Sequence, residues 1–131
     1  MLQIMLESTP QMLAVQATGM LTDEDYKGVW LEALQKIIDE YEVANVLLYM
    51  DENFEGWELK AMWEDAKFGM KHRNDFSRIA VVGGPNWVHW GVKIGELMMD
   101  CHVKTYAPEE LQEAIKWASV VAKCACKNCD D

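Results

Sequence analysis

The chain has 131 residues, of which 50% are hydrophobic and 26% are charged, as expected for one soluble globular domain. Acids outnumber bases by 22 to 12, and the formal net charge of −10 argues against nucleic-acid binding, which depends on Lys and Arg neutralising phosphates. No apolar run approaches the ~20 residues of a membrane-spanning helix, and the N-terminus lacks the basic start of a signal peptide, so we expect a cytoplasmic protein.

The first half of the sequence predicts a hairpin, an amphipathic helix and a buried strand. Two β-type runs flank a Ser-Thr-Pro-Gln turn, and apolar residues then recur three and four positions apart behind Thr22, which can cap a helix. An almost wholly apolar run follows, as is typical of a central parallel strand. The expected elements are strands over 2–7 and 12–18, a helix over 22–42, a strand over 43–50 and a loop over 51–56.

The second half alternates helices and strands. The expected elements are a helix over 57–71, a strand over 78–82, a turn over 83–86, a helix over 87–99, a strand over 102–106 and a helix that opens around Pro108. The order β-β-α-β-α-β-α-β-α predicts an α/β fold whose later strands are parallel and joined by right-handed crossovers. We expect one domain over 1–123, followed by a Cys-rich acidic tail over 124–131.

Charge is distributed unevenly along the chain. Eleven acids and only two bases lie between Thr22 and Glu58, so this segment carries nine of the ten net negative charges. The stretch from Lys60 to Arg78 has five bases and three acids, and is mildly basic. Since a surface responds to its local field, the overall charge does not exclude an anionic lipid as a partner.

A second apolar strip marks the helix expected over 57–71. At 100° per residue, Trp57, Ala61 and Phe68 fall together on the side nearly opposite the core-facing residues. Packing under the loop around Phe54 is the more ordinary role for such a strip. The alternatives are an apolar ligand cleft, a partner surface or a membrane-facing edge.

Two tryptophans raise the same question. Trp87 and Trp90 follow a Gly-Gly-Pro turn at the carboxyl end of a predicted parallel strand, where ligands of open α/β sheets bind. A basic cluster lies nearby in the sequence. The candidate ligand-binding residues are Trp57, Phe68, Trp87, Trp90, Lys67, Lys71, His72 and Arg73.

The tail holds three of the four cysteines at C-x-C-x-x-C spacing, namely Cys124, Cys126 and Cys129. We favour a loose tail of reduced thiols, because the cluster is short and terminal. A soft metal bound by the three thiolates, with Cys101 or His102 as a fourth ligand, and a disulfide are the alternatives. We therefore expect no metal and no cofactor, with the tail as a weak candidate metal site.

Catalytic motifs are absent from the sequence. There is no P-loop, no G-x-G-x-x-G and no G-x-S-x-G, and the three histidines and three serines form no local triad pattern. We therefore expect a protein that is not an enzyme, although a triad assembled in space is not excluded by sequence.

Several features in order resemble the SpoIIAA-like proteins of the STAS superfamily. The likeness spans about residues 2–120 and is carried by Asn53–Trp57, Met62–Phe68, His72, Phe76–Gly83 and Trp87. The resemblance implies a mixed five-stranded sheet with helices largely on one face, and a binding or regulatory role. Anti-sigma-factor antagonists of the broader superfamily are switched by phosphorylation of a serine at the start of the second helix. The matching region here, Asp51–Trp57, contains no Ser or Thr, which argues against that switch.

Our leading hypothesis is a non-enzymatic domain that binds an apolar or amphipathic ligand, with peripheral membrane association. The SpoIIAA-like branch is associated with such proposals, and its winding is similar to that of lipid-carrying CRAL-TRIO domains. The four aromatic candidates would line the cleft, and the basic cluster would attract an anionic head group. The alternatives are a protein-interaction module that uses the acidic segments 23–42 or 51–58, a homodimer interface and, least favoured, an enzyme.

Overall fold

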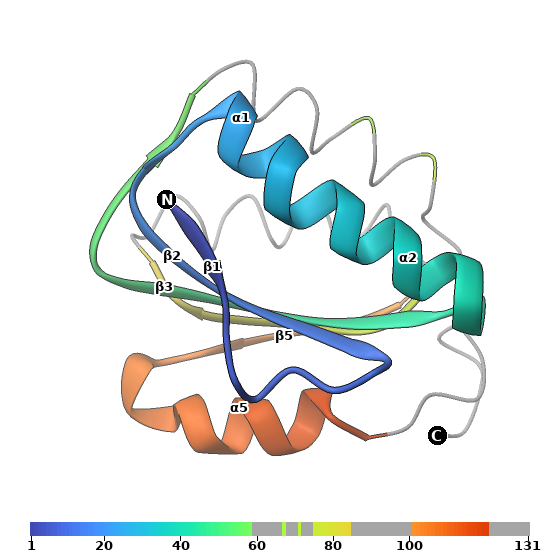
Figure 1. Ribbon diagram of the computed structural model, residues 1–131. Helices are drawn as coiled ribbons and strands as arrows, with labels where there is room; N and C mark the ends of the chain where they lie inside the picture. The colour runs from blue at the N-terminus through green and yellow to red at the C-terminus, as the bar shows by residue number, and fades with distance from the viewer. Residues whose placement is uncertain (59–66, 68–70, 72–74, 85–100, 121–131) are drawn as a thin grey trace.

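The computed structural model has a five-stranded sheet in the order β1-β2-β3-β4-β5, with described helices on both of its faces (Figure 1). It describes residues 1–58, 67, 71, 75–84 and 101–120, without the side chains of Tyr26 and Trp57. The strands are β1 (Leu2–Ile4), β2 (Met12–Leu21), β3 (Ala44–Trp57), β4 (Phe76–Gly83) and β5 (His102–Tyr106). The helical elements are α1 (Asp23–Asp25), the π-helical η1 (Tyr26–Leu31), α2 (Glu32–Tyr41), the 3-10 turn η2 (Pro108–Glu110) and α5 (Leu111–Ala118).

The predicted α/β fold with a mixed sheet is confirmed. β1 pairs with β2 in antiparallel fashion, and β2, β3, β4 and β5 are parallel to one another. The continuous rod of α1, η1 and α2 covers one face, and α5 covers the other (Figure 1). Two hydrophobic clusters result, because alternate residues of a strand point to opposite faces. Val46 of β3 packs in the cluster that includes Leu34 of α2, and Leu47 packs in the cluster that includes Ala114 of α5.

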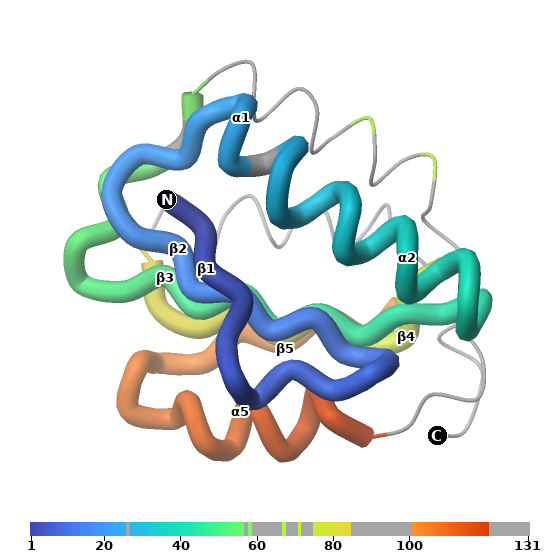
Figure 2. Tube along the Cα trace, viewed as in Figure 1, coloured from blue at the N-terminus to red at the C-terminus, as the bar shows by residue number. Residues whose placement is uncertain are grey.

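The loop expected over 51–56 is instead a strand. β3 continues to Trp57, and its last part pairs with the end of β2, from Gly19 opposite Phe54 to Leu21 opposite Trp57. Register shifts around Gly19, where φ is +63°, accompany the curve of these two strands away from the sheet (Figure 2). The polar residues of this stretch are typical of a loop, but a two-stranded ribbon with one solvent-exposed side contains them equally often. Trp57 therefore ends a strand, whereas we expected it to open a helix.

The helix expected over 22–42 is confirmed, with an irregular start. The backbone N–H of Thr22 donates to Oδ2 of Asp25, and the backbone N–H of Asp25 donates to Oγ1 of Thr22, both at 3.1 Å. This reciprocal cap satisfies two donors at the helix start. The next six residues are π-helical, a rare conformation that the apolar spacing did not predict.

The buried side chain of Asn45 fastens α5 to the sheet. Its Nδ2 donates to the carbonyl oxygens of Ala118, at 2.8 Å, and Val120, at 2.7 Å. Its Oδ1 accepts the backbone N–H of Arg78 at 3.1 Å. One amide thus satisfies carbonyls at the end of α5 and a backbone donor of β4.

Three expectations fall on residues outside those that the structure describes. They are most of the helix over 57–71, of which Lys67 and Lys71 are described and helical, the whole helix over 87–99, and the tail over 124–131. Within the described part of the chain, no helix combines the length and apolar character needed to cross a membrane.

Candidate functional site

The carboxyl ends of β2, β3, β4 and β5 lie at one edge of the sheet, the edge where we expected a ligand. At this edge Leu21 pairs with Trp57, and the backbone N–H of Glu58 donates to the carbonyl oxygen of Leu21 at 2.8 Å. The backbone of Trp57 is thus fixed at the tip of the β2–β3 ribbon. β4 stops earlier along the sheet, where Gly83 pairs with Met50.

The chain leaves β4 through two glycines in a left-handed conformation. φ is +75° at Gly83 and +87° at Gly84, values that residues with a side chain rarely adopt. A Cβ atom on Gly83 would lie 2.5 Å from the carbonyl oxygen of Met50, so the backbone of β4 approaches β3 too closely for any side chain. Of the turn predicted over 83–86, the structure describes Gly83 and Gly84, and the backbone at Gly83 requires glycine.

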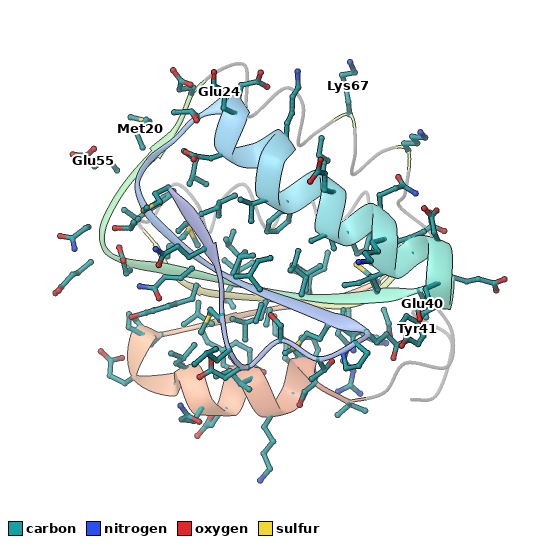
Figure 3. The ribbon with its side chains drawn as sticks, viewed as in Figure 1. Met20, Glu24, Glu40, Tyr41, Glu55 and Lys67 are labelled. Atoms are coloured by element: carbon teal, nitrogen blue, oxygen red, sulfur yellow. The ribbon has the colours of Figure 1, made fainter. Side chains whose placement is uncertain are left out.

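The structure describes only part of the predicted ligand site. Lys67 and Lys71 are exposed and helical, and Figure 3 shows Lys67 pointing away from α2. Residues four apart lie on the same side of a helix, so these two charges are neighbours. The other six candidates are not described, except for the backbone of Trp57; they are Trp57, Phe68, Trp87, Trp90, His72 and Arg73. The aromatic cleft stays a prediction.

The acidic segment found in the sequence is a surface feature. Eight of its eleven carboxylates belong to exposed residues: five lie between Glu24 and Glu42, along the helical rod and its cap, and three lie between Glu52 and Glu58, at the end of β3 (Figure 3 labels Glu24, Glu40 and Glu55). The exposed acids are Glu24, Glu32, Asp39, Glu40, Glu42, Glu52, Glu55 and Glu58. Asp51 differs from them, because its carboxylate accepts bonds from Nε2 of Gln16, at 3.0 Å, and from the backbone N–H of Asn53, at 2.9 Å.

The end of α2 combines charge, an exposed aromatic ring and an unusual backbone. We call Asp39, Glu40, Tyr41 and Glu42 the acidic tip. All four residues are exposed, and the Tyr41 residue keeps 40% of its surface open to solvent (Figure 3). Glu42 caps the helix with φ of +67°, and the last turn of α2 has no basic residue.

Each feature of the acidic tip is locally unfavourable. Carboxylates at a helix C-terminus oppose the helix dipole, which favours cations there. A left-handed cap favours glycine over a residue with a side chain. Such conflicts with local rules concentrate at functional sites, which makes the acidic tip the strongest candidate among the described residues. Sequence analysis marked the acidic segment but not this end of it, because the left-handed backbone at Glu42 has no signal in the residue types.

Among the described residues, no group of three His, Cys, Asp or Glu side chains is arranged to hold a metal ion. Cys101 is described and is buried in the core on the α2 side. Its possible partners in the tail, Cys124, Cys126 and Cys129, lie outside the described ranges.

Comparison with known proteins agrees with the architecture. The family model described as SpoIIAA-like matches residues 12–119. A crystal structure of an uncharacterized protein from the DUF3478 family of Shewanella loihica PV-4, with a SpoIIAA-like fold, is similar at a TM-score of 0.68 and 26% sequence identity. The alignment covers 89% of this chain and 93% of that one. No curated protein matches the sequence.

Proposed function

This chain belongs to the SpoIIAA-like family, and we propose that it is a non-enzymatic cytoplasmic binding domain whose acidic tip receives a basic surface of a protein partner. The observation that carries the proposal is that three carboxylates, one of them on the left-handed Glu42, and an exposed tyrosine lie together at the end of α2. Folding alone gives no reason to place these features together.

A basic partner would relieve what is unfavourable at the acidic tip. An Arg or Lys brought to the end of α2 would meet both the carboxylates and the negative end of the helix dipole. Tyr41 would supply a large contact area, and tyrosine is among the residues enriched at energetic centres of interfaces. The remaining exposed acids would speed the approach of a basic partner through long-range attraction.

The proposal is tested by comparing two triple variants with equal charge. D39N/E40Q/E42Q neutralises the acidic tip, and E24Q/E32Q/E52Q removes three exposed carboxylates elsewhere. The purified chain is cross-linked in an extract of its source cells, and the proteins joined to it are identified by mass spectrometry. The affinity of each such protein for the wild type and for both variants is then measured. We expect at least a tenfold weaker Kd for the tip variant and less than a threefold change for the control. Equal affinity for both variants would refute a role for the tip.

A second function is favoured by the exposed pair Lys67 and Lys71. We propose binding of an amphipathic ligand or an anionic membrane, with these lysines facing the head groups. They are two of the five bases in the mildly basic stretch from Lys60 to Arg78, and they lie on one side of a helix. The predicted aromatic candidates, Trp57, Phe68, Trp87 and Trp90, would contact the apolar part of the ligand.

Vesicle flotation separates this function from the first. The wild-type chain should float with vesicles that contain phosphatidylserine and not with neutral phosphatidylcholine vesicles. K67Q/K71Q should lose most of this binding, whereas K27Q/K36Q, which also removes two positive charges, should retain it. Equal loss of vesicle binding in both variants would indicate a general charge effect and would refute this second site.

A further inference from the structure

Two cations share one indole ring on the face of the sheet that α5 covers. The guanidinium carbon of Arg78, in β4, lies 5.1 Å from the ring centroid of Trp117, and Nζ of Lys104, in β5, lies 5.2 Å from it. The two cationic groups are thus at most about 10 Å apart. We call Arg78, Lys104 and Trp117 the cation–indole cluster.

The sheet register explains this convergence. Arg78 pairs with His102, and Ala80 pairs with Lys104, so Lys104 lies two residues further along the neighbouring strand on the same face. Ala80 packs with Ala114 and Ala118 of α5, which identifies this face as the one that α5 covers. Trp117, one residue before Ala118, reaches the edge of the sheet where β5 lies.

Arg78 is held firmly, whereas Lys104 is open to solvent. Nη1 of Arg78 donates to the carbonyl oxygen of Trp117 at 2.9 Å, and the backbone N–H of Arg78 donates to Oδ1 of Asn45. Nε of Arg78 is buried and has no hydrogen-bond partner. Lys104 is exposed, so an incoming group has free access to it.

Neither cation of the cluster forms an ion pair with a carboxylate of the described residues. The ion pairs of the described residues join the N-terminal ammonium to Asp25 and Lys27 to Asp23. Acids are present nearby, since burial, Glu113 and Glu110 raise the pKa of Tyr106, whose ring centroid lies 6.4 Å from that of Trp117. Neither glutamate forms an ion pair with Arg78 or Lys104 among the described residues. Each cation–π contact contributes only about 0.5–1 kcal/mol at an exposed site, so the ring does not neutralise the charges.

We propose that the cation–indole cluster is a binding site for a phosphate group. A phosphate dianion would match the two unpaired positive charges, with the fixed Arg78 presenting its planar fork and Lys104 closing over the bound oxygens as a mobile point charge. The site is distinct from the acidic tip and from Lys67 and Lys71, since it lies on the face of the sheet that α5 covers. The phosphate would be carried by a small phosphomonoester or by a lipid head group.

The test is an NMR titration of the indole N–H signals with inorganic phosphate at constant ionic strength. The Trp117 signal is assigned by its loss in the variant Trp117→Phe. We expect a saturable shift of this signal, with an affinity about fivefold weaker in Lys104→Gln, as for loss of one partly screened ion pair. Lys36→Gln, which removes an exposed lysine on α2, should bind phosphate as the wild type does.

Several results would overturn the site. They are the absence of a saturable Trp117 shift, an equal shift caused by acetate or chloride at the same ionic strength, and equal weakening in Lys104→Gln and Lys36→Gln. The source of the phosphate is then distinguished with two further probes. Glycerol 3-phosphate that binds without flotation on phosphatidic acid vesicles indicates a small ligand, and flotation that Lys104→Gln abolishes indicates a lipid head group.

Discussion

Gly83 and Met50 approach each other so closely that a methyl group on residue 83 would lie 2.5 Å from the carbonyl oxygen of Met50. The contact is between backbones, so no side-chain rotation can relieve it. It occurs at the last residue pair that joins β3 and β4, immediately before the chain turns away from the sheet. Space and backbone conformation both require glycine at this position.

Two glycine-to-alanine variants should therefore change stability in opposite directions. Gly83→Ala should lower the free energy of unfolding by about 2 kcal/mol or more, because the φ of +75° and the backbone contact both penalise a side chain. Gly28→Ala, within η1, meets nothing within 4 Å and should raise the free energy by about 0.5–1 kcal/mol. Urea unfolding measures both, and a change of the same sign in both variants would contradict the explanation.

Replacing Glu42 by glycine should stabilise the chain. The residue is exposed and has a φ of +67°, so glycine removes the strain of the left-handed cap and should raise the free energy of unfolding by about 0.5–1 kcal/mol. Glu42→Ala is the matched control, because it removes the same charge and keeps the strain. Thermal unfolding should give the higher Tm for Glu42→Gly, and equal Tm values would mean that charge alone matters.

Removing the amide of Asn45 should loosen α5 from the sheet. Asn45→Ala leaves two carbonyls and one N–H without their partner in a buried place, at a cost of about 3 kcal/mol. Near-ultraviolet circular dichroism should change as well, because Trp117 lies on α5. Asn53→Ala, on the exposed ribbon, should change the free energy of unfolding by less than about 0.5 kcal/mol. Similar losses in the two variants would argue against the fastening role.

The stability of the chain should depend on Asp25 in acid. Burial acts to raise the pKa of Asp25, but hydrogen bonds from Thr22 and the N-terminal ammonium outweigh it and hold that pKa below 3.8. A lowered pKa means that the unfolded chain takes up the proton first, so the stabilisation is present above pH 3.8 and is lost as the pH falls below that value. The difference in stability between wild type and Asp25→Asn should shrink in this range. A difference that stays constant down to pH 2.5 would contradict the assignment.

The fold could be predicted from the sequence because buried apolar residues recur with the period of the helix or strand that carries them. The apolar run that begins at residue 43 correctly predicted the central strand. The apolar residues three and four positions apart before it correctly predicted the helix. The ribbon over 51–57 was missed because one exposed side permits the same polar letters as a loop. The π-helical turn was missed because the apolar spacing that predicted the helix does not separate the two helix types.

The sites were less accessible, for a different reason. The acidic tip depends on a backbone angle at Glu42, and the cation–indole cluster depends on contacts among three elements far apart in sequence. The alternation of His102, Lys104 and Tyr106 shows only that these residues share a face. Nothing in the residue types indicates that Trp117 would contact this face. Trp57 and Phe68 were predicted from a helical projection, and Trp57 shows how such a projection fails when the residue is in a strand.

The bonds made by Asn45 also have a mechanical consequence. Because one amide of β3 binds the carbonyl oxygens of both Ala118 and Val120, the end of α5 is tied directly to the middle strand of the sheet. A force applied to the chain at Val120 would act on the hydrogen bonds of the Asn45 amide before it could unwind α5. The chain at Val120 is thus anchored at the centre of the domain, and a force applied there would act first on β3.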